Sequence, residues 1–375
     1  MSSRGEFSTV HLSTARSWRG GENQLLLLAR GLKERGHEAL VVAPKGAPLL
    51  DRAADAGLPV RALTLRGDLD PAGTWRLARL LREVRPDILH LHDGHAVLPG
   101  QLTGRLARTM GVIAHRRTVF RVRGSWKYTG RVDRVIAISE AVRERLMAAG
   151  VPEERVTVAY SGLAFPEALP RDRALAFRRE LDLPENAILV AHAAALTKEK
   201  RQLDLLAAIR TCAKEGVPIH LAVAGAGAME AELKAAATGE LAGRVHWLGF
   251  RRDLRPLWAA ADVAAFCSEA EGLCTALVEA QGAGVPAVVT RAGGMTEVVE
   301  EGRTGWLVPV GAVEELAAAL IRLATDTEER QRMGGEASRH ARGKFSAQVM
   351  VDTILRVYGE VLKVRKRTKE APARS

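Results

Sequence analysis

Short apolar runs alternate with segments whose apolar residues recur at helical spacing through the first half of the chain. A short apolar run between turn residues is typical of a buried strand, whereas apolar residues three and four positions apart are typical of an amphipathic helix. The pattern predicts strands at residues 7–12, 39–43, 60–65 and 87–92, and helices at residues 23–35, 49–56 and 73–84. Strands and helices that alternate in this way favour a parallel, doubly wound α/β sheet.

The same alternation returns after a segment rich in Gly and Pro at residues 161–170, where we expect a linker. Strands are predicted at residues 187–195, 219–224, 245–248, 262–266 and 287–290, with helices at 202–215, 229–237, 275–280, 312–323 and 328–342. We therefore predict a first domain at residues 1–165 and a second at 170–345. An amphipathic helix is expected at 346–364, followed by a disordered basic tail at 365–375.

Composition is compatible with a globular protein of two domains. The chain has 375 residues, of which 47% are hydrophobic and 26% charged. It has no run of the roughly 20 apolar residues that span a membrane, and its first six residues lack the apolar core of a signal peptide. The three cysteines do not suggest a disulfide framework or a zinc knuckle, and Cys212 and Cys267 are expected to be buried. These features predict a cytoplasmic protein.

Positive charge is concentrated in one segment of the first domain. The net charge is +11, and the segment that begins with Arg105 and ends with Arg134 carries nine positive charges and one negative charge. Phe120, Trp126 and Tyr128 are interleaved with these charges. Such a segment suits an anionic membrane surface or a phosphorylated acceptor, whereas nucleic acid is disfavoured because no recognised binding motif accompanies it. We therefore expect peripheral attachment to the inner face of the cytoplasmic membrane.

The segment 268–297 combines features that suit a ligand with both phosphate and sugar. Its sequence predicts a loop after a buried strand, then a helix, with Glu271 in the loop and Glu279 eight residues later in the helix. Amides at a helix N-terminus favour anions, and carboxylates accept hydrogen bonds from hydroxyls. Gly293 and Gly294 would let the backbone approach a ligand closely. A nucleotide-sugar would satisfy both sets of groups.

The run EGLCTALVEAQGAGVP, followed by AVVTRAGGMTEVVEEGRTGWLVP, resembles the retaining glycosyltransferases of the GT-B fold, in particular family 4. The resemblance implies two Rossmann-like, doubly wound domains that face one another across a cleft. It implies transfer of a sugar from a nucleotide-diphosphate sugar to a hydroxyl, with retention and without a metal or other cofactor. The acceptor, a glycan or glycolipid, would bind the first domain, and lipopolysaccharide, glycolipid or other cell-envelope glycan synthesis is the expected setting.

The resemblance also assigns donor-binding positions in the second domain. Glu271 would contact the transferred sugar, Glu279 the ribose hydroxyls, and Lys200 the diphosphate. The family has an Arg where this chain has Ala195, so Lys198 or Arg201 would substitute for it, and the family usually has Gly or Pro where this chain has Cys274. The remaining positions expected at the donor are Gly225, Phe250, Gly272, Leu273, Cys274 and Thr275.

In the first domain, the resemblance places Gly20, Gly21 and Glu22 in a glycine-rich loop that faces acceptor and donor phosphate. Ligand sites gather at the carboxyl ends of parallel strands, so His92 is expected to point into the cleft. His115 and Arg117 are candidates for the acceptor side, with His115 a candidate acid or base. Retaining transfer needs no enzymic base if the leaving phosphate takes the acceptor proton, so the identity of any base stays open.

Several alternatives remain. A nucleotide-sugar epimerase or hydrolase of the same fold would share the donor residues. A metal-dependent hydrolase would use His90, His92 and His95, since a strand places His90 and His92 on one face. A non-catalytic membrane or nucleic-acid binder would use the basic segment instead. Asp68 and Asp70 resemble the metal-binding Asp-x-Asp of another glycosyltransferase fold, but Pro71 favours a turn and a helix cap.

Overall fold

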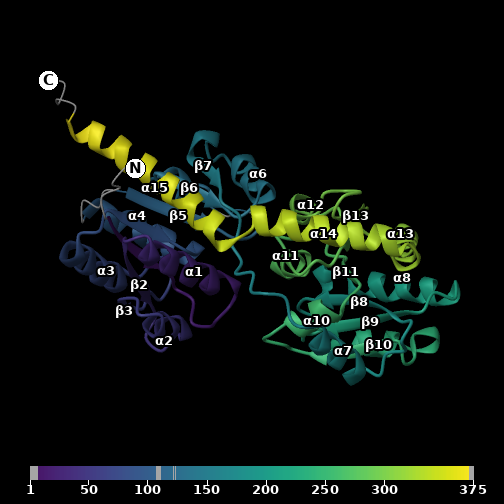
Figure 1. The fold of residues 1–375 in the computed structure, drawn as a ribbon. Helices are drawn as coiled ribbons and strands as arrows, with labels where there is room; N and C mark the ends of the chain where they lie inside the picture. The colour runs from purple at the N-terminus through teal and green to yellow at the C-terminus, as the bar shows by residue number, and fades with distance from the viewer. Residues whose placement is uncertain (1–6, 107–110, 121, 123, 371–375) are drawn as a thin grey trace. The chain divides into compact units, whose positions relative to one another are not determined.

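A computed structural model describes residues 7–106, 111–120, 122 and 124–370 (Figure 1). The chain divides into two compact units. Unit 1 consists of residues 1–162 and 347–375, and unit 2 consists of residues 163–346. In the part of the chain that is described, no helix combines the length and the hydropathy needed to cross a membrane.

Unit 1 contains a parallel sheet of seven strands in the order β3-β2-β1-β4-β5-β6-β7. The strands are β1 (Ser8–Leu12), β2 (Glu38–Ala43), β3 (Val60–Ala62), β4 (Ile88–Leu91), β5 (Gly111–Arg116), β6 (Arg134–Ala137) and β7 (Val156–Val158). The helices are α1 (Gly20–Glu34), α2 (Pro48–Asp55), α3 (Pro71–Val84), α4 (Gly94–Leu106), α5 (Trp126–Thr129), α6 (Glu140–Ala148), the 3₁₀ turn η1 (Glu153–Arg155) and α15 (Ala347–Glu370).

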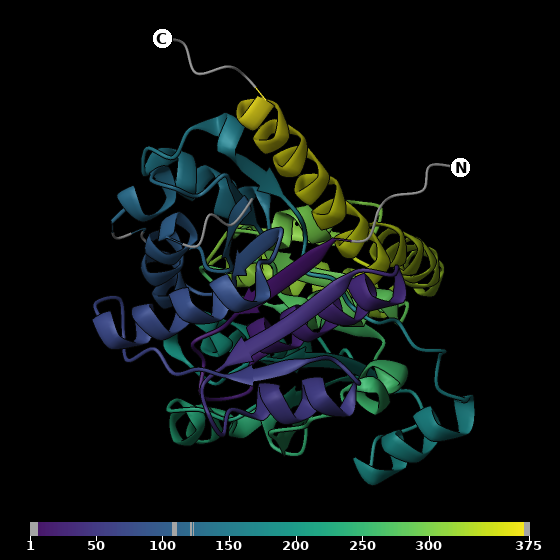
Figure 2. The same cartoon turned by 90° about the vertical axis from the view of Figure 1, so that its left-hand side faces the viewer.

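Alternate residues of the strands of unit 1 belong to two separate cores. Val41 packs with residues of α1, α2 and α15, whereas Leu40 and Val42 pack with residues of α3 and α4. This alternation follows from the two-residue period of a strand. The two cores explain why the strands read as continuous apolar runs, since both faces of the sheet are covered by helices. Helix α15, yellow in both views, contacts α1 and β5 (Figures 1 and 2).

Two predictions about unit 1 need correction at the ends of helices. Helix α1 begins at Gly20, three residues before the predicted start, because the Glu22 carboxylate accepts a hydrogen bond from the Arg19 amide at 3.0 Å and so closes the first turn. Helix α15 continues to Glu370, so residues 365–370 are helical and not a disordered tail. The Arg365 guanidinium donates two hydrogen bonds to Asp133, which ties this part of the helix to unit 1.

Unit 2 contains a parallel sheet of six strands in the order β10-β9-β8-β11-β12-β13. The strands are β8 (Ile188–Ala193), β9 (Ile219–Ala224), β10 (Val245–Gly249), β11 (Val263–Phe266), β12 (Ala287–Thr290) and β13 (Gly305–Val308). The helices are α7 (Arg171–Glu180), α8 (Gln202–Lys214), α9 (Glu230–Ala236), α10 (Arg255–Ala260), α11 (Thr275–Gly282), α12 (Met295–Val298), α13 (Val313–Thr325) and α14 (Thr327–Lys344), with 3₁₀ turns η2 (Lys198–Lys200) and η3 (Gly239–Leu241).

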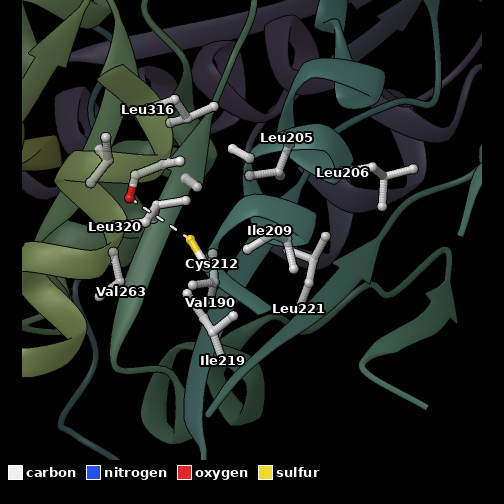
Figure 3. Close-up of a cluster of buried hydrophobic side chains, with 14 of the residues drawn as sticks. Val190, Leu205, Leu206, Ile209, Cys212, Ile219, Leu221, Val263, Leu316 and Leu320 are labelled. Atoms are coloured by element: carbon white, nitrogen blue, oxygen red, sulfur yellow. Dashed lines mark hydrogen bonds between the residues drawn. The ribbon is translucent and has the colours of Figure 1, made fainter. Parts of the chain in front are cut away.

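Cys212 lies in the core of unit 2, on the face of α8 that packs against α13. Leu205 and Ile209 of α8 pack against Leu316 and Leu320 of α13 in a buried cluster over the sheet (Figure 3). The Cys212 thiol lies 3.7 Å from the Ala317 carbonyl oxygen, and burial raises its pKa to about 12. Cys267 is also fully buried. The predicted burial of these two cysteines is confirmed, and both thiols are free.

In each sheet, the order in which successive strands are added reverses at one point. In unit 1 the order turns between β1 and β4, and in unit 2 it turns between β8 and β11. The loops that follow these two central strands diverge to opposite faces, so they leave room for a ligand beyond the carboxyl ends of the strands. In unit 2 these loops carry Lys200 and Glu271.

Candidate functional site

Lys200 and Glu271 meet at the switch point of unit 2. Lys200 ends the 3₁₀ turn that follows β8, and Glu271 lies in the loop between β11 and α11. The Lys200 Nζ lies 2.5 Å from Glu271 Oε1, and the two side chains are only 17% and 13% exposed. The Ser268 hydroxyl donates a second hydrogen bond to Glu271 Oε1 at 3.0 Å. A cation and a carboxylate are therefore held together where a ligand of this fold class is expected.

Glycines allow the site loops of unit 2 to pack without side chains between them. A Cβ on Gly293 would lie 2.1 Å from the Glu271 carbonyl oxygen, and one on Gly294 would lie 2.2 Å from the Gly272 carbonyl oxygen. A Cβ on Gly225 would lie 1.9 Å from the Ala194 carbonyl oxygen. Gly225 was predicted to contact the donor. Glycine is also required at this position for packing, because it lets the loop after β9 approach the loop that leads to Lys200.

Glu279 lies within α11 and is partly buried. The Trp258 Nε1–H donates to Glu279 Oε2 at 3.4 Å, and burial raises the pKa of this carboxyl. A cavity of about 700 Å³ opens beside it, with walls from α10, the segment before α7 and α14. Phe165, Arg252, Trp258 and Arg342 line this cavity together with Glu279. Its size falls in the range of small-molecule sites, roughly 300–1,000 Å³.

The other positions predicted to bind the donor differ in exposure and in their contacts within unit 2. Arg201 is held by Asp204 at 2.7 Å and by Glu269 at 3.7 Å, so its charge is offset within unit 2. Leu273 is 2% exposed and belongs to the core, so it does not present a side chain at the surface. Phe250 is 74% exposed at the end of β10, which rules out a core role for it. Gly272 and Thr275 flank Leu273 and Cys274, and Thr275 is the first residue of α11.

Cys274 adopts a backbone conformation that favours glycine. Its φ is +63° and its ψ is +75°, and it is the residue immediately before α11. A residue with a Cβ loses about 1–2 kcal/mol in the left-handed region. Cys274 is half-buried, and desolvation of the thiol together with the neighbouring Glu271 carboxylate holds its pKa well above the usual range. Cys274, at a position where the resemblance predicts Gly or Pro, therefore introduces both backbone strain and a half-buried thiol at the site.

We expect Cys274→Gly to stabilise unit 2 by roughly 1 kcal/mol, because glycine adopts positive φ without steric cost. Urea unfolding followed by tryptophan fluorescence would measure the change. Cys267→Gly is the matched control, since Cys267 is buried without a positive φ and its replacement should destabilise unit 2 by cavity formation. Equal destabilisation by both substitutions would contradict the strain at Cys274.

In unit 1, Arg117 lies against the first turn of α1. A Cβ on Gly21 would lie 3.5 Å from Arg117 Cδ, so glycine leaves space for the arginine side chain. Gly20 and Gly21 are the first residues of the helix, and the glycine-rich loop predicted there is helical. The pKa of Arg117 is lowered to about 10 by burial, against the opposing effect of the nearby Glu22 and Asp93 carboxylates.

Four buried histidines form a cluster on the α1 and α15 face of the sheet in unit 1. His11 of β1 and His90 of β4 are register partners, and the His90 ring stacks on His92 and His115 with centroid distances of 4.1 and 5.3 Å. The Tyr358 hydroxyl of α15 shares a 2.6 Å hydrogen bond with His90 Nδ1. The sequence identified three of these histidines, but it gave no sign that His11 and Tyr358 would join them.

Hydrogen bonds fix which ring nitrogens carry protons in this cluster. The Arg117 Nη2 group donates to His92 Nδ1 at 3.2 Å and to His115 Nδ1 at 3.3 Å, which uses both of its protons. His92 therefore carries its proton on Nε2 and donates it to His11 Nδ1 at 3.0 Å. His115 likewise carries its proton on Nε2. In this arrangement His115 is a hydrogen-bond donor and is not poised to accept a proton.

The cluster of His90, His92 and His95 that the alternative of a metal-dependent hydrolase requires is not formed. His95 is exposed on α4 and pairs with Asp68 at 3.0 Å. His11 takes its place, since the ring nitrogens of His11, His90 and His92 lie within 4.8 Å of one another. The lone pairs of His11 and His92 are already engaged in hydrogen bonds, and the Arg117 cation lies beside them. The donor set therefore does not fit a metal ion.

The Asp68 to Asp70 segment forms a turn and a helix cap, as predicted. Asp70 Oδ1 accepts from the Gly73 amide at 2.9 Å, and Asp70 Oδ2 accepts from the Arg66 amide at 3.0 Å. Asp70 precedes Pro71, the first residue of α3. These hydrogen bonds lower the pKa of Asp70.

The described part of the basic segment, residues 111–120, 122 and 124–134, is spread over both ends of β5 and not over one surface. Arg117 follows the carboxyl end of β5, whereas Asp133 pairs with the amino end of β5 and Arg134 begins β6. Lys127 forms an ion pair with Asp68, and Tyr128 is buried, so it is not available to a membrane surface. Phe120 and Trp126 are exposed. Arg121 and Arg123 lie outside the described residues, and attachment to a membrane stays a prediction.

Comparison with known proteins gives consistent matches over both units. Residues 175–340 match the family described as glycosyl transferases group 1, and residues 18–164 match glycosyltransferase family 4. The chain is 30% identical to a GDP-mannose-dependent alpha-mannosyltransferase of Mycobacterium tuberculosis (strain CDC 1551 / Oshkosh), over 94% of this chain and 95% of that protein. It is 25% identical to N-acetyl-alpha-D-glucosaminyl L-malate synthase of Bacillus anthracis, over 91% of this chain and 94% of that protein.

Solved structures share the fold. Anabaena Alr3699/HepE in complex with UDP matches with a TM-score of 0.84 at 23% identity, over 94% of this chain and 100% of that chain. A glycosyltransferase from Rickettsia africae ESF-5 matches with a TM-score of 0.87 at 18% identity, over 96% of this chain and 99% of that chain. The two doubly wound units thus define a protein of the GT-B fold. The chain belongs to the group 1 glycosyltransferases, of the family 4 type.

Proposed function

We propose that this glycosyltransferase moves a sugar from a nucleoside-diphosphate sugar to a hydroxyl acceptor, with retention and without a metal ion. The observation that carries the proposal is the Lys200–Glu271 pair at the switch point of unit 2. A diphosphate needs positive charge as it leaves, and Lys200 together with the first-turn amides of α11 would supply it. Glu271 would then be released from Lys200 to accept from hydroxyls of the transferred sugar.

Glu279 and the adjacent cavity support a nucleoside site in unit 2. The Glu279 carboxylate would accept hydrogen bonds from the ribose hydroxyls, while its Oε2 atom accepts a hydrogen bond from Trp258 Nε1 at 3.4 Å. Phe250 and the walls of the 700 Å³ cavity would receive the base. The M. tuberculosis relative is named for GDP-mannose, and the Anabaena structures hold UDP or UDP-glucose. These names support a nucleotide-sugar donor, and the sugar and the base are left open.

The acceptor proton would pass to the leaving phosphate in this proposal. His115 Nδ1 accepts a hydrogen bond from Arg117, so the proton lies on Nε2, which has no partner; His115 would donate this proton to an oxygen atom of a substrate in a hydrogen bond and would not act as the base. Transfer on the same face of the sugar, with the phosphate oxygen as proton acceptor, gives retention. Relatives named for lipopolysaccharide core biosynthesis in Rhizobium meliloti and for colanic acid in Escherichia coli favour an acceptor in cell-envelope glycan synthesis.

Donor binding tests the proposal directly. Isothermal titration with UDP- and GDP-sugars should identify one donor, and Glu279→Ala should weaken its binding by roughly 1–3 kcal/mol through loss of charged hydrogen bonds. Glu301→Ala is the control, because Glu301 forms an exposed ion pair with Arg291 outside the site. Transfer to an acceptor should continue in excess EDTA.

Three results would redirect the proposal. Turnover of the donor without an acceptor would favour an epimerase or hydrolase of the same fold. A strict requirement for a divalent ion would contradict charge neutralisation by Lys200. Equal donor affinity in wild type and Glu279→Ala would remove the nucleoside site from α11.

A further inference from the structure

Unit 1 contains a second cavity, which four arginines surround. None of the residues discussed above for sugar transfer lines this cavity. The cavity has a volume of about 490 Å³ and is lined by Arg131, Arg134, Arg155 and Arg365 together with Asp133 and the backbone of residues 130 and 132. It lies at the amino ends of the strands, because the Asp133 amide donates to the Val112 carbonyl oxygen at the start of β5. His115 and Arg117 lie at the opposite, carboxyl end of this strand.

The one carboxylate of this arginine cavity is already neutralised. Asp133 accepts two hydrogen bonds from Arg365, at 3.0 and 2.8 Å, and one from the Val112 amide at 2.8 Å. These bonds also fix the end of α15 as one wall of the cavity. The charge of Asp133 is therefore not available to offset the other three arginines.

Arg131, Arg134 and Arg155 form no ion pair with a carboxylate in the part of the chain that is described. Arg155 donates through Nη1 to the Thr129 carbonyl oxygen at 2.7 Å, and Arg134 donates through Nη1 to the Asp133 carbonyl oxygen at 3.2 Å. These bonds to the backbone hold the guanidinium groups in place but leave their positive charge uncompensated. Lys363, Lys366 and Arg367, exposed on α15, add to the positive potential on this side.

We propose that the arginine cavity is a binding site for a phosphate-bearing anion, separate from the donor and acceptor sites. Guanidinium groups recognise phosphate oxygens through paired N–H donors, and an anion held among several of them is neutralised by more than one charge. The cavity is polar and partly enclosed by α15, so its charges are screened less than those of an open surface. The phosphate could belong to a soluble polyphosphate or to the headgroup of an anionic lipid.

Pyrophosphate is the probe for the site, titrated calorimetrically at low ionic strength into the full chain with Lys200→Ala, which removes the other candidate diphosphate site. We expect saturable binding that the double substitution Arg131→Gln/Arg134→Gln weakens at least tenfold. The control Arg79→Gln/Arg82→Gln removes the same charge from exposed arginines of α3 and should leave the affinity within twofold. Circular dichroism melting would confirm that both double variants are folded.

Vesicles distinguish the two sources of phosphate. If vesicles of 70% phosphatidylcholine and 30% phosphatidylglycerol displace pyrophosphate, and pure phosphatidylcholine vesicles do not, the site takes lipid headgroups; if neither displaces it, the site takes a soluble phosphate. Absence of saturable pyrophosphate binding, or equal weakening by the two double substitutions, would overturn the proposal. Neither result bears on sugar transfer, because donor binding by the wild-type chain is measured separately.

Discussion

Lys200→Ala is expected to lower the kcat of sugar transfer by about 10²–10³-fold, the cost typical of removing one charge-stabilising donor from a transition state. Lys200 is 17% exposed and is the cation nearest to Glu271 at the carboxyl ends of β8 and β11. The negative charge of a diphosphate increases as the bond to the sugar breaks, so the ammonium contributes more to the transition state than to donor binding. The loss should therefore appear mainly in kcat.

Substitutions at Glu271, the ion-pair partner of Lys200, and at the neighbouring Lys198 provide matched variants for this prediction. Glu271→Gln keeps the size of the side chain and removes its charge, and it should lower kcat more than it lowers donor affinity. Lys198→Ala tests the alternative phosphate-binding residue: Lys198 lies in the same 3₁₀ turn but is exposed, so its removal should lower kcat far less than Lys200→Ala. Lys200→Ala also leaves Glu271 without its ion pair, so the free energy of unfolding should be measured alongside. Full activity in Lys200→Ala would refute the assigned role.

Acidification is expected to unfold unit 1 before unit 2, at a pH well above the usual range of carboxylate titration. Burial lowers the pKa of His11 to about 3 and lowers the pKa values of His90, His92 and His115 well below normal. In unit 2, burial lowers the pKa values of His192 and His220 to about 4 and also lowers those of His246 and His340, but only His192 is as deeply buried as the four histidines of unit 1. Histidine in the unfolded chain titrates near 6.5, so below that pH the unfolded chain binds protons that the folded chain does not.

The sign of the effect follows from this difference. The folded pKa values are depressed, so the stabilisation by the neutral histidines is complete above pH 6.5 and is lost as the pH falls toward the folded pKa values. At pH 5 each fully buried histidine should remove roughly 2 kcal/mol. For the four histidines of unit 1, the combined loss is comparable to the entire stability of a typical domain, about 5–15 kcal/mol.

Calorimetric unfolding between pH 7 and pH 4.5 would test this expectation by resolving the transitions of the two units. His11→Gln should reduce the pH dependence of the first transition by about one proton. The relevant quantity is the slope of the free energy of unfolding against pH. The free energy itself should fall at every pH, because His11→Gln also breaks the hydrogen bond to His92. A first transition that does not shift between pH 6.5 and pH 5 would contradict the neutral histidine cluster.

The local pattern of the chain was sufficient to predict most elements around the site of unit 2. Strand β11 and helix α11 lie where the apolar run and the helix formers predicted them. Gly293 and Gly294 allow a close approach to the backbone of Glu271 and Gly272, and their approach to a ligand stays a prediction. Asp70 caps α3 as predicted. These features depend on neighbouring residues, through period, capping and steric freedom, so the sequence carries them directly.

Errors arose where a partner distant in the sequence decided the outcome. The tail predicted to be disordered is helical to Glu370, and Arg365 there pairs with Asp133. His95 lies close to His92 in the sequence but points to Asp68, and Tyr128 is buried although it lies in a strongly basic segment. In each case a contact far along the chain, or burial by the fold, outweighed the local signal.

The sequence by itself determined that this protein has two doubly wound domains and that Glu271, Glu279 and Lys200 are its strongest candidates for donor binding. Only the tertiary structure decided which side chains meet. Lys200 reaches Glu271 because β8 and β11 are neighbours in the sheet, and His11 joins His90, His92 and His115 because β1 lies beside β4, which lies beside β5. Strand order is fixed by the packing of the whole chain, and the spacing of residues along the sequence does not specify it.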